Sequence, residues 1–194
     1  MSKALENYKT KRETIIKAGR ELFLSHGYSR TSMDEVAKRA EVTKQTVYRY
    51  FVSKSDLFAE VISQISKEND VYVFGDLTPD KELVKFGINF VSMHMERHRL
   101  ELFRMMIAES GDGSEIGGMF KSMVQDARRK PLTVFLEEKY KLRDADRMAN
   151  LLISMLLSMR SPILMNTRSV PEKDEITSHV ETCVKLFLNG IKGF

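Results

Sequence analysis

The sequence predicts an all-helical protein, with an N-terminal three-helix head, a C-terminal helical domain and about nine helices altogether. Three observations support this fold class. The 194 residues contain only four Pro and ten Gly. No segment shows a sustained alternation of apolar and polar residues, and apolar residues instead recur at helical spacing. We expect residues 1–55 to form the head and residues 56–194 to form the second domain.

The composition is that of a folded protein from a reducing compartment. Apolar residues make up 42% of the chain and charged residues 30%, which argues against disorder. The single Cys excludes an internal disulfide framework and a structural zinc site with several thiolates. Apolar runs are only a few residues long, and the first residues lack the apolar region of a signal peptide. We therefore expect a cytoplasmic protein with no membrane span.

The first two helices of the head are marked by an apolar stripe and by capping residues. A helix over residues 9–26 carries one apolar stripe and ends before Gly27, a common stop position. Ser32 and Glu35 form a capping box, in which each side chain accepts a hydrogen bond from the other's backbone N–H. This box predicts a short second helix that reaches about Ala40.

Two further start signals follow in the head. Thr43 is placed to cap a third helix that runs through Phe51, and Ser53 opens a fourth that reaches about Asn69. Apolar residues on the second and third helices are spaced to pack together, which is helix-turn-helix geometry. The third helix is then free to present its polar side chains outward: Lys44, Gln45, Thr46, Tyr48 and Arg49.

Basic residues are concentrated in the head. Residues 1–54 hold twelve Lys and Arg against six Asp and Glu, a net charge of +6. Residues 55–194 hold 19 against 21, a net charge of −2. This asymmetry is expected where one end of a protein meets a polyanion, although a solvated basic surface gives the same count. The three-helix spacing and the polar third helix favour nucleic acid, since those side chains reach base edges and phosphates.

A set of residues in the head forms a pattern that is far more specific than any single short motif. Its members are Ile15, Ala18, Leu22, Phe23, Gly27, Tyr28, Thr31, Ser32, Met33, Val36, Ala37, Val42, Thr43, Lys44, Thr46, Val47, Tyr48, Tyr50, Phe51, Ser53, Lys54, Leu57 and Phe58. The set covers about the first 60 residues and resembles the DNA-binding head of TetR/AcrR-type transcriptional regulators. The resemblance implies a homodimer that binds a palindromic double-stranded operator through two recognition helices. It also implies a C-terminal domain for dimerisation and for an apolar small-molecule effector, which usually releases a repressor.

Carried across position by position, the resemblance implies two groups of DNA contacts. Base reading falls to the third helix, through Lys44, Gln45, Thr46 and Arg49, with Arg49 also able to contact phosphate. Phosphate contacts fall to Thr31, Ser32, Tyr48, Tyr50 and Lys54. Chemically, a Gln side chain can bind adenine through two hydrogen bonds, and a Lys side chain can reach O6 and N7 of guanine.

One position departs from the family pattern. The turn between the second and third helices usually carries Gly, and this chain has Glu41 there. A non-Gly residue in a left-handed conformation costs on the order of 1 kcal/mol. The carboxylate would also lie beside the DNA-facing side, where it would weaken binding slightly.

Proline and glycine positions organise the second domain. After an apolar connector over residues 71–78, Pro79 stands in first-turn position for a fifth helix. No strand precedes the Gly-rich segment 111–118 and no Lys-Ser/Thr pair follows it, so we interpret it as a turn rather than a phosphate loop. Pro131 is expected to kink the seventh helix. The five expected helices cover residues 79–97, 99–110, 115–140, 145–164 and 171–191.

The last two expected helices carry long apolar stripes. Such stripes suit a four-helix bundle between two subunits, although burial within one subunit requires the same pattern. A reader of palindromic DNA needs two-fold symmetry, and the resemblance implies a dimer, so we favour the interface. The expected interface residues are Met148, Leu152, Val180, Cys183, Val184 and Phe187.

Ten of the twelve Met lie between Met93 and Met165, interleaved with Phe. A Met-rich interior is more often plain core, yet Met is adaptable and lets a helical interior reshape around apolar guests. Because the family usually has an effector pocket, we expect one here. Its expected lining is Phe90, Met93, His94, Phe103, Met106, Phe120, Met123, Met155 and Met159.

Metal and catalytic chemistry find little support in the sequence. His94 with His98, and His179 with Cys183, each lie one helical turn apart, but no third ligand stands at suitable spacing. We therefore expect no metal and no other cofactor. A helical enzyme would need a nucleophile–base pair or a convergent acid pair, and neither is evident. The remaining alternative is a DNA-binding regulator that responds to a protein partner or to no effector.

Overall fold

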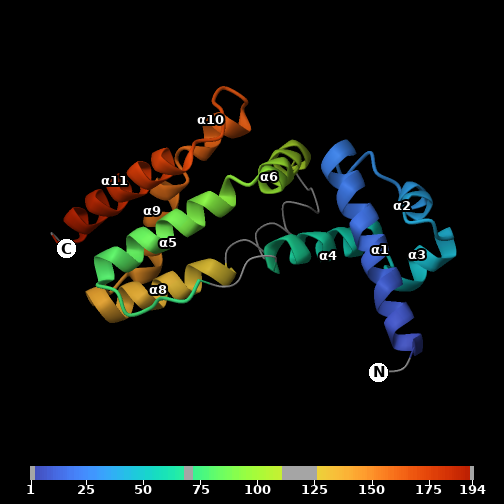
Figure 1. The fold of residues 1–194 in the computed structure, drawn as a ribbon, viewed down its shortest axis with the longest axis horizontal. Coiled ribbons are helices and arrows are strands. Elements are labelled where there is room, and N and C mark those ends of the chain that lie inside the picture. The colour runs from blue at the N-terminus through green and yellow to red at the C-terminus, as the bar shows by residue number, and fades with distance from the viewer. Residues whose placement is uncertain (1–2, 68–71, 111–125, 193–194) are drawn as a thin grey trace. The chain divides into compact units, whose positions relative to one another are not determined.

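The fold is all-helical, which confirms the predicted fold class. The computed structural model describes residues 3–67, 72–110 and 126–192, and in these ranges it contains ten α-helices and no β-strand (Figure 1). No helix within them is both long enough and apolar enough to cross a bilayer. The chain divides into two compact units, residues 1–69 with 101–123 and residues 70–100 with 124–194.

The helices of the first unit begin and end close to their sequence signals. The unit contains α1 (Lys3–His26), α2 (Met33–Arg39), α3 (Lys44–Tyr50), α4 (Lys54–Lys67) and the larger part of α6 (Arg97–Glu109). Gly27 follows α1 with a φ of 87°, a left-handed conformation that Gly adopts without strain. The first helix starts six residues earlier than predicted, since residues 3–8 contain no Gly or Pro to stop it.

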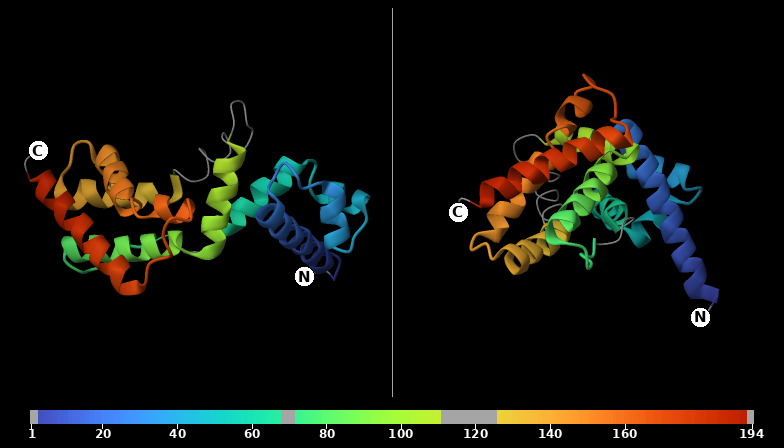
Figure 2. Two further views of the ribbon diagram at one scale, coloured as in Figure 1. Left: turned by 90° about the horizontal axis from the view of Figure 1, so that it is seen from above. Right: turned by 60° about the vertical axis from the view of Figure 1, so that its left-hand side comes forward.

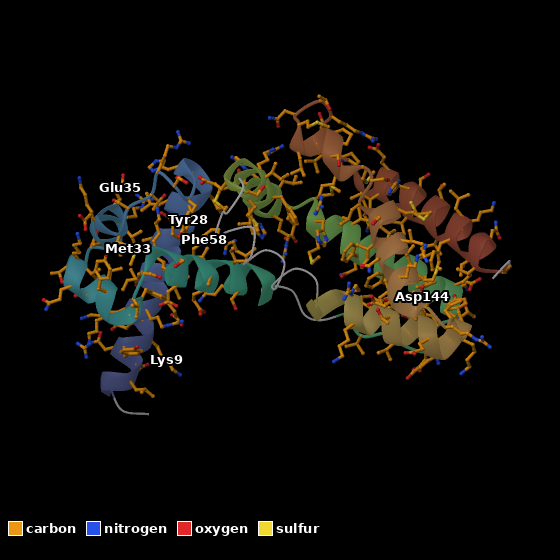
Figure 3. All side chains as sticks on the ribbon, turned by 180° about the vertical axis from the view of Figure 1, so that it is seen from behind. Lys9, Tyr28, Met33, Glu35, Phe58 and Asp144 are labelled. Atoms are coloured by element: carbon orange, nitrogen blue, oxygen red, sulfur yellow. The ribbon has the colours of Figure 1, made fainter. Side chains whose placement is uncertain are left out.

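Apolar side chains from the helices of the first unit form one core. Ile15, Phe23, Val47 and Phe58 are each at most 1% exposed. The ring of Tyr28 lies 4.9 Å from that of Phe58, centroid to centroid (Figure 3). The second half of α6 adds three further side chains, Leu102, Met105 and Met106. This core holds α2 against α3, as the helix-turn-helix spacing predicts.

The second unit is built on two helix pairs. It contains α5 (Pro79–His94), α8 (Asp126–Tyr140), α9 (Ala145–Leu156), α10 (Arg160–Leu164) and α11 (Lys173–Ile191). Helix α11 runs alongside α5, as Figure 1 and the right-hand view of Figure 2 show, and α8 packs on α9. Phe86, Leu132, Leu152 and Val180 lie in their shared core, each at most 2% exposed.

Gly87 allows α5 and α11 to approach closely. A Cβ atom at this position would lie 2.5 Å from Cγ1 of Val180 and 3.2 Å from Cδ2 of Leu156. Real Cβ atoms essentially never show the first of these distances, so the Val180 side chain or one of the two helices would have to shift. The packing of α11 on α5 therefore depends on a residue without a side chain at position 87.

The single helix predicted over residues 145–164 is wrong. The chain instead forms α9 and α10, with a turn between Leu156 and Arg160. Pro162 has no N–H to donate to the carbonyl of Ser158, and its ring would clash with that carbonyl in a continuous helix. The part of the seventh predicted helix over residues 115–125 lies outside the described residues, and Pro131 lies inside α8.

A buried carboxylate orders the connector before α5. Glu82, in the first turn of α5 and 1% exposed, accepts hydrogen bonds from the Tyr72 hydroxyl at 3.0 Å and the Leu77 N–H at 3.3 Å. The N–H of Gly75 donates a further bond. These bonds, that of Gly75 above all, outweigh burial and hold the pKa of the Glu82 carboxyl below its usual range. They fix Tyr72 and Leu77 beside α5.

Candidate nucleic-acid interface and ligand sites

The N-terminus of α2 is fixed by the predicted capping box. The N–H of Glu35 donates to the Ser32 hydroxyl at 3.2 Å, and the N–H of Ser32 donates to the Glu35 carboxylate at 2.8 Å. The bond from the Ser32 backbone lowers the pKa of the Glu35 carboxyl, with help from the Ser32 hydroxyl. Figure 3 labels Glu35 on this exposed end of the head. The capping box is confirmed.

Helix α3 presents one polar face to solvent. Thr43 caps the helix by accepting a hydrogen bond from the Thr46 N–H at 3.2 Å, and Val47 anchors the opposite face at 0% exposure. The side chains of Lys44, Gln45, Tyr48 and Arg49 are exposed. Thr46 is half-buried, and its hydroxyl lies 2.8 Å from that of Thr43. Of the five polar residues predicted to point outward on α3, four are therefore exposed to solvent and Thr46 is partly exposed.

An ion pair links the start of α3 to α2. The Lys44 ammonium lies 2.8 Å from Oδ1 and 3.1 Å from Oδ2 of Asp34. The hydrogen bond and the charge of Asp34 raise the pKa of the Lys44 ammonium. Since both side chains are more than half exposed, the pair contributes little to stability and can open when a phosphate or a base edge competes.

Two side chains predicted to contact phosphate, those of Thr31 and Ser32, form hydrogen bonds within the head. Thr31 is 1% exposed, and its hydroxyl donates to the carbonyl of Gly27 at 2.8 Å. Its burial disagrees with a side-chain contact to DNA, because the hydroxyl closes the α1–α2 turn instead. The Ser32 hydroxyl is exposed and lies in the capping box, 2.9 Å from the Glu35 carboxylate.

The Lys54 ammonium closes the loop between α1 and α2. It donates to the carbonyls of Tyr28 and Thr31 at 2.9 Å each and to that of Ser29 at 3.3 Å. It also lies 4.5 Å from the centre of the Tyr28 ring, a cation–π geometry. The predicted phosphate contact therefore has a second role in the free protein, which is to hold the loop that leads into α2.

We expect Lys54→Met to lower the melting temperature by about 2–4 °C, since about 1 kcal/mol is lost when three partly exposed carbonyls lose a charged donor. Differential scanning calorimetry measures this change. Lys38→Met, at an exposed position of α2, is the matched control and should leave the melting temperature unchanged. If both variants melt like the parent, the loop does not depend on Lys54. If Lys54 also contacts a phosphate, Lys54→Met should separately reduce the salt dependence of DNA binding by about one ion.

Tyr50 packs on the first turns of α1, which precede the predicted start of that helix. Its ring centre lies 4.6 Å from that of Tyr8, and Tyr50 is half-buried. Tyr48, by contrast, is 44% exposed. Of the two predicted tyrosine contacts, Tyr48 is therefore the more accessible.

Glu41 has a left-handed backbone, with a φ of 54°. The conformation is the one for which the family pattern supplies Gly, so this chain carries the strain of a side chain at that turn. The turn itself is intact, since the N–H of Val42 donates to the carbonyl of Ala37 at 3.0 Å.

We expect Glu41→Gly to raise the free energy of unfolding by up to about 1 kcal/mol, because Gly removes the left-handed strain. For a chain of this length that is a rise in melting temperature of about 2–4 °C. Thermal unfolding followed by circular dichroism measures it. Glu41→Ala serves as the control, since it removes the charge and keeps the strain. Equal melting temperatures for the Gly and Ala variants would contradict the strain at this turn.

Glu109 at the end of α6 binds the same α1–α2 loop. Its carboxylate accepts hydrogen bonds from the Ser29 N–H at 3.0 Å and from the Ser29 hydroxyl. Burial alone would raise the pKa of the Glu109 carboxyl. The two hydrogen bonds from Ser29, together with the charges of Lys54 and Arg30, outweigh burial, so the pKa lies below its usual value. The loop is therefore held from two sides, by Lys54 and by Glu109.

Sequence reasoning missed three residues that shape this surface: Asp34, Glu109 and Tyr8. Asp34 lies ten positions from Lys44 and Glu109 lies eighty positions from Ser29, and no local pattern indicates such pairs. Tyr8 had a usable signal, because residues 3–8 consist of residues that a helix tolerates.

The residues predicted to line an effector pocket fall into separate places. Phe90, Met93 and Met159 are buried in the core of the second unit, Met155 packs against it, and His94 is likewise buried. Met106 is buried in the core of the first unit, and Phe103 lies half-buried in the same unit. Phe120 and Met123 lie outside the described residues. The rings of Phe90 and His94 lie 4.3 Å apart, and Nδ1 of His94 is 2.7 Å from the Phe90 carbonyl.

Most residues predicted for a subunit interface are already covered within one chain. Leu152, Val180, Cys183, Val184 and Phe187 are at most 7% exposed, and Met148 is half-buried. Their side chains therefore have little surface left for a second subunit, and the apolar stripe serves the core of its own chain. The exposed apolar residues on the same two helices are Leu151 at 49% and Leu186 at 59%.

The side chains of His179 and Cys183 contact the end of α9 and each other. Nε2 of His179 lies 3.1 Å from the Leu156 carbonyl and 3.5 Å from the Cys183 sulfur. Burial raises the pKa of the Cys183 thiol, so the reactive thiolate is disfavoured. Within the described ranges, no group of three or more His, Cys, Asp or Glu side chains is placed to hold a metal ion.

Family models match both parts of the chain. Residues 15–61 match the model of bacterial regulatory proteins of the tetR family. Residues 81–190, more than half of the chain, match the C-terminal domain of AefR-like transcriptional repressors.

Curated relatives match a segment of about 58 residues of the chain. The chain is 40% identical over 58 residues to the HTH-type transcriptional regulator YhgD of Bacillus subtilis, a segment that is 30% of each protein. Over 58 residues it is 43% identical to the HTH-type transcriptional regulator AcrR of Shigella flexneri, which is 30% of this chain and 26% of that protein. The matches therefore span less than a third of the length of these relatives.

Solved structures match almost the whole chain. The flavonoid-responsive regulator FrrA superposes with a TM-score of 0.79 at 28% identity, covering 94% of this chain and 97% of that one. A TetR-family transcriptional regulator from Mesorhizobium loti superposes with a TM-score of 0.77 at 22% identity, covering 97% and 98%. The capped α2, the exposed face of α3 and the two matched models agree: the chain belongs to the TetR/AcrR family of transcriptional regulators and is not an enzyme.

Proposed function

We propose that this regulator is a homodimeric repressor whose two α3 helices bind the half-sites of a palindromic operator. The observation that carries the proposal is the exposed face of α3, where Lys44, Gln45, Tyr48 and Arg49 stand together on a helix anchored by Val47. These side chains supply cationic groups, a carboxamide and a hydroxyl, which are the groups that contact phosphates and base edges in the major groove. The matched C-terminal model, that of a transcriptional repressor, supports repression rather than activation.

We place the dimer contact on the exposed sides of α9 and α11. Leu151 and Ser154 of α9, with Thr182 and Leu186 of α11, are exposed at helical spacing, opposite the residues that fill the core. Small Ser and Thr side chains allow helices to approach closely, and the two Leu side chains supply apolar area. Two such helices from each subunit would form the four-helix bundle that a two-fold symmetric DNA reader needs.

Leu186→Arg tests the dimer contact, because it places a charge on the proposed bundle. Light scattering coupled to gel filtration should give a dimer for the parent and a monomer for the variant. Val134→Arg, at a 43% exposed apolar position on α8, is the matched control and should stay dimeric. A monomeric parent at micromolar concentration, with or without operator DNA, would contradict the homodimer.

The effector acts through the second unit in this proposal. An apolar molecule would bind among Phe90, Met93, His94, Met155 and Met159, where Met side chains can repack around it. It releases the operator only if it prefers the conformation that no longer fits two half-sites. The response of the similar regulator FrrA to flavonoids, stated in its name, supports a small-molecule effector.

The experiment is an operator-release assay on the full-length protein. Compounds that raise the melting temperature in a thermal-shift screen of apolar molecules are added to the preformed operator complex, and DNA release is followed by fluorescence anisotropy. The proposal expects at least one stabilising compound to release the operator. Stabilising compounds that all leave the complex intact would overturn the effector mechanism while leaving operator binding standing.

A further inference from the structure

An open groove runs along the second unit between α5 and α11. Its volume is about 900 Å³, within the range of sites that hold small organic molecules. Two apolar side chains from each helix line it: Val84 and Ile88 from α5, and Val184 and Leu188 from α11. Val184 is 3% exposed, and the other three are half-buried and pack against the core beneath. The groove therefore has a fixed apolar floor.

Four lysines stand along this floor. Lys81 and Lys85 come from α5, Lys185 comes from α11, and Lys192 is the residue that caps the end of α11. All four are exposed, and none of them forms an ion pair with another described residue. Long lysine side chains can lay their methylene groups along an apolar surface while the ammonium group stays in water. Both sides of the groove thus offer cations above apolar side chains.

The acids of the groove do not cancel this charge. Only Asp80 and Glu181 are acidic among the lining residues, against four lysines, which leaves an excess of two positive charges. Asp80 accepts a hydrogen bond from the Tyr140 hydroxyl at 2.7 Å. Burial and this bond to Asp80 together raise the pKa of the Tyr140 hydroxyl, so the phenol stays a donor. Of the two carboxylates, that of Asp80 therefore already accepts a hydrogen bond from Tyr140.

The floor of the groove is separate from the residues of the effector site and the dimer contact proposed above. The buried residues of the proposed effector site lie in the core and do not line the groove. On α11 the groove uses Val184, Lys185 and Leu188, whereas the proposed dimer contact uses Thr182 and Leu186. At 100° per residue, these two sets lie on different sides of the helix.

We propose that the α5–α11 groove binds an amphipathic organic anion, with an apolar chain or ring on the Val, Ile and Leu floor and a carboxylate among the lysines. Charge complementarity selects the anion, since four lysines line the groove against two carboxylates. The apolar floor selects a ligand with a hydrophobic body over a simple ion such as acetate. Binding here depends neither on the dimer nor on operator release.

Isothermal titration calorimetry of the full-length protein with three C10 probes tests the site. The probes are decanoate, decan-1-ol and decyltrimethylammonium, which share one chain length and differ in charge. Decanoate should bind at least about tenfold more tightly than either of the others. The double variant Lys85→Met/Lys185→Met keeps both side-chain stems and should lose most of that preference, with decanoate binding weakened at least about fivefold.

Lys139→Met is the matched control, because Lys139 is an exposed lysine of the same unit that does not line the groove. It should bind decanoate like the parent. Unchanged decanoate binding in the double variant, or equal binding of the three probes by the parent, would overturn the site. Operator binding of each variant is measured in parallel, so that a failure of the regulator function is told apart from a failure of the groove.

Discussion

Replacing Gln45 by Ala should change which operator the protein prefers while leaving its general affinity for DNA intact. Gln45 is exposed in the first turn of α3, where recognition helices contact base edges. A Gln carboxamide that binds adenine through two hydrogen bonds discriminates against other bases by about 1–3 kcal/mol. We therefore expect a loss of about 5- to 150-fold in operator affinity for each half-site. Fluorescence anisotropy with operator and with unrelated DNA measures both affinities.

Tyr48→Phe is the matched comparison on the same helix. It removes one exposed hydroxyl, and if that hydroxyl binds phosphate, affinity for operator and for unrelated DNA falls by the same factor. The salt dependence should be the same for both variants, since neither substitution removes a charge. If Gln45→Ala weakened operator and unrelated DNA equally, the assignment of base reading to Gln45 would be wrong.

Gly87→Ala should destabilise the second unit, although Ala is the better helix former. The new Cβ would meet Cγ1 of Val180 at 2.5 Å, and overpacking of this kind costs about 1–3 kcal/mol. The gain in helix propensity returns only about 1 kcal/mol. Because 2.5 Å is far below van der Waals contact, we expect a cost toward the upper end of that range. The net loss is then about 1–2 kcal/mol, or about 2–8 °C in melting temperature. Calorimetry on the full-length protein measures it.

Gly190→Ala provides the matched control, because nothing lies within 4 Å of a Cβ at that position of α11. It should stabilise the protein slightly or have no effect. The double variant Gly87→Ala/Val180→Ala should be more stable than the sum of its single variants predicts, since the second change removes the clashing atom. A Gly87→Ala variant as stable as the parent would contradict the close approach of α5 and α11.

The head could be predicted from sequence because its signals are local. The capping box of Ser32 and Glu35, the cap at Thr43 and the stop at Gly27 each depend on residues within one turn, and the structure confirms all three. What sequence could not provide was the partner of each charged side chain. Lys54 and Glu109 meet at the α1–α2 loop although 55 positions separate them, and no spacing rule connects them.

The second unit was less predictable because its signals are ambiguous. The apolar stripes of α9 and α11 fit burial within one chain as well as they fit a subunit interface, and the packing around Gly87 covers most of the stripe within the chain. The break between α9 and α10 did have a signal, in the proline at position 162. The groove had none, since its floor and its lysines come from two helices almost 100 positions apart.

Selection from a pool of random double-stranded DNA tests the central claim most directly. The full-length protein is bound to the pool at physiological salt, and the retained DNA is sequenced. The claim predicts one enriched inverted repeat, with half-sites one helical turn of about 34–36 Å, or a multiple of it, apart. It predicts as well that the Gln45→Ala variant enriches a repeat altered at one base pair of each half-site. A retained pool without a shared two-fold symmetric sequence would contradict operator reading by paired α3 helices.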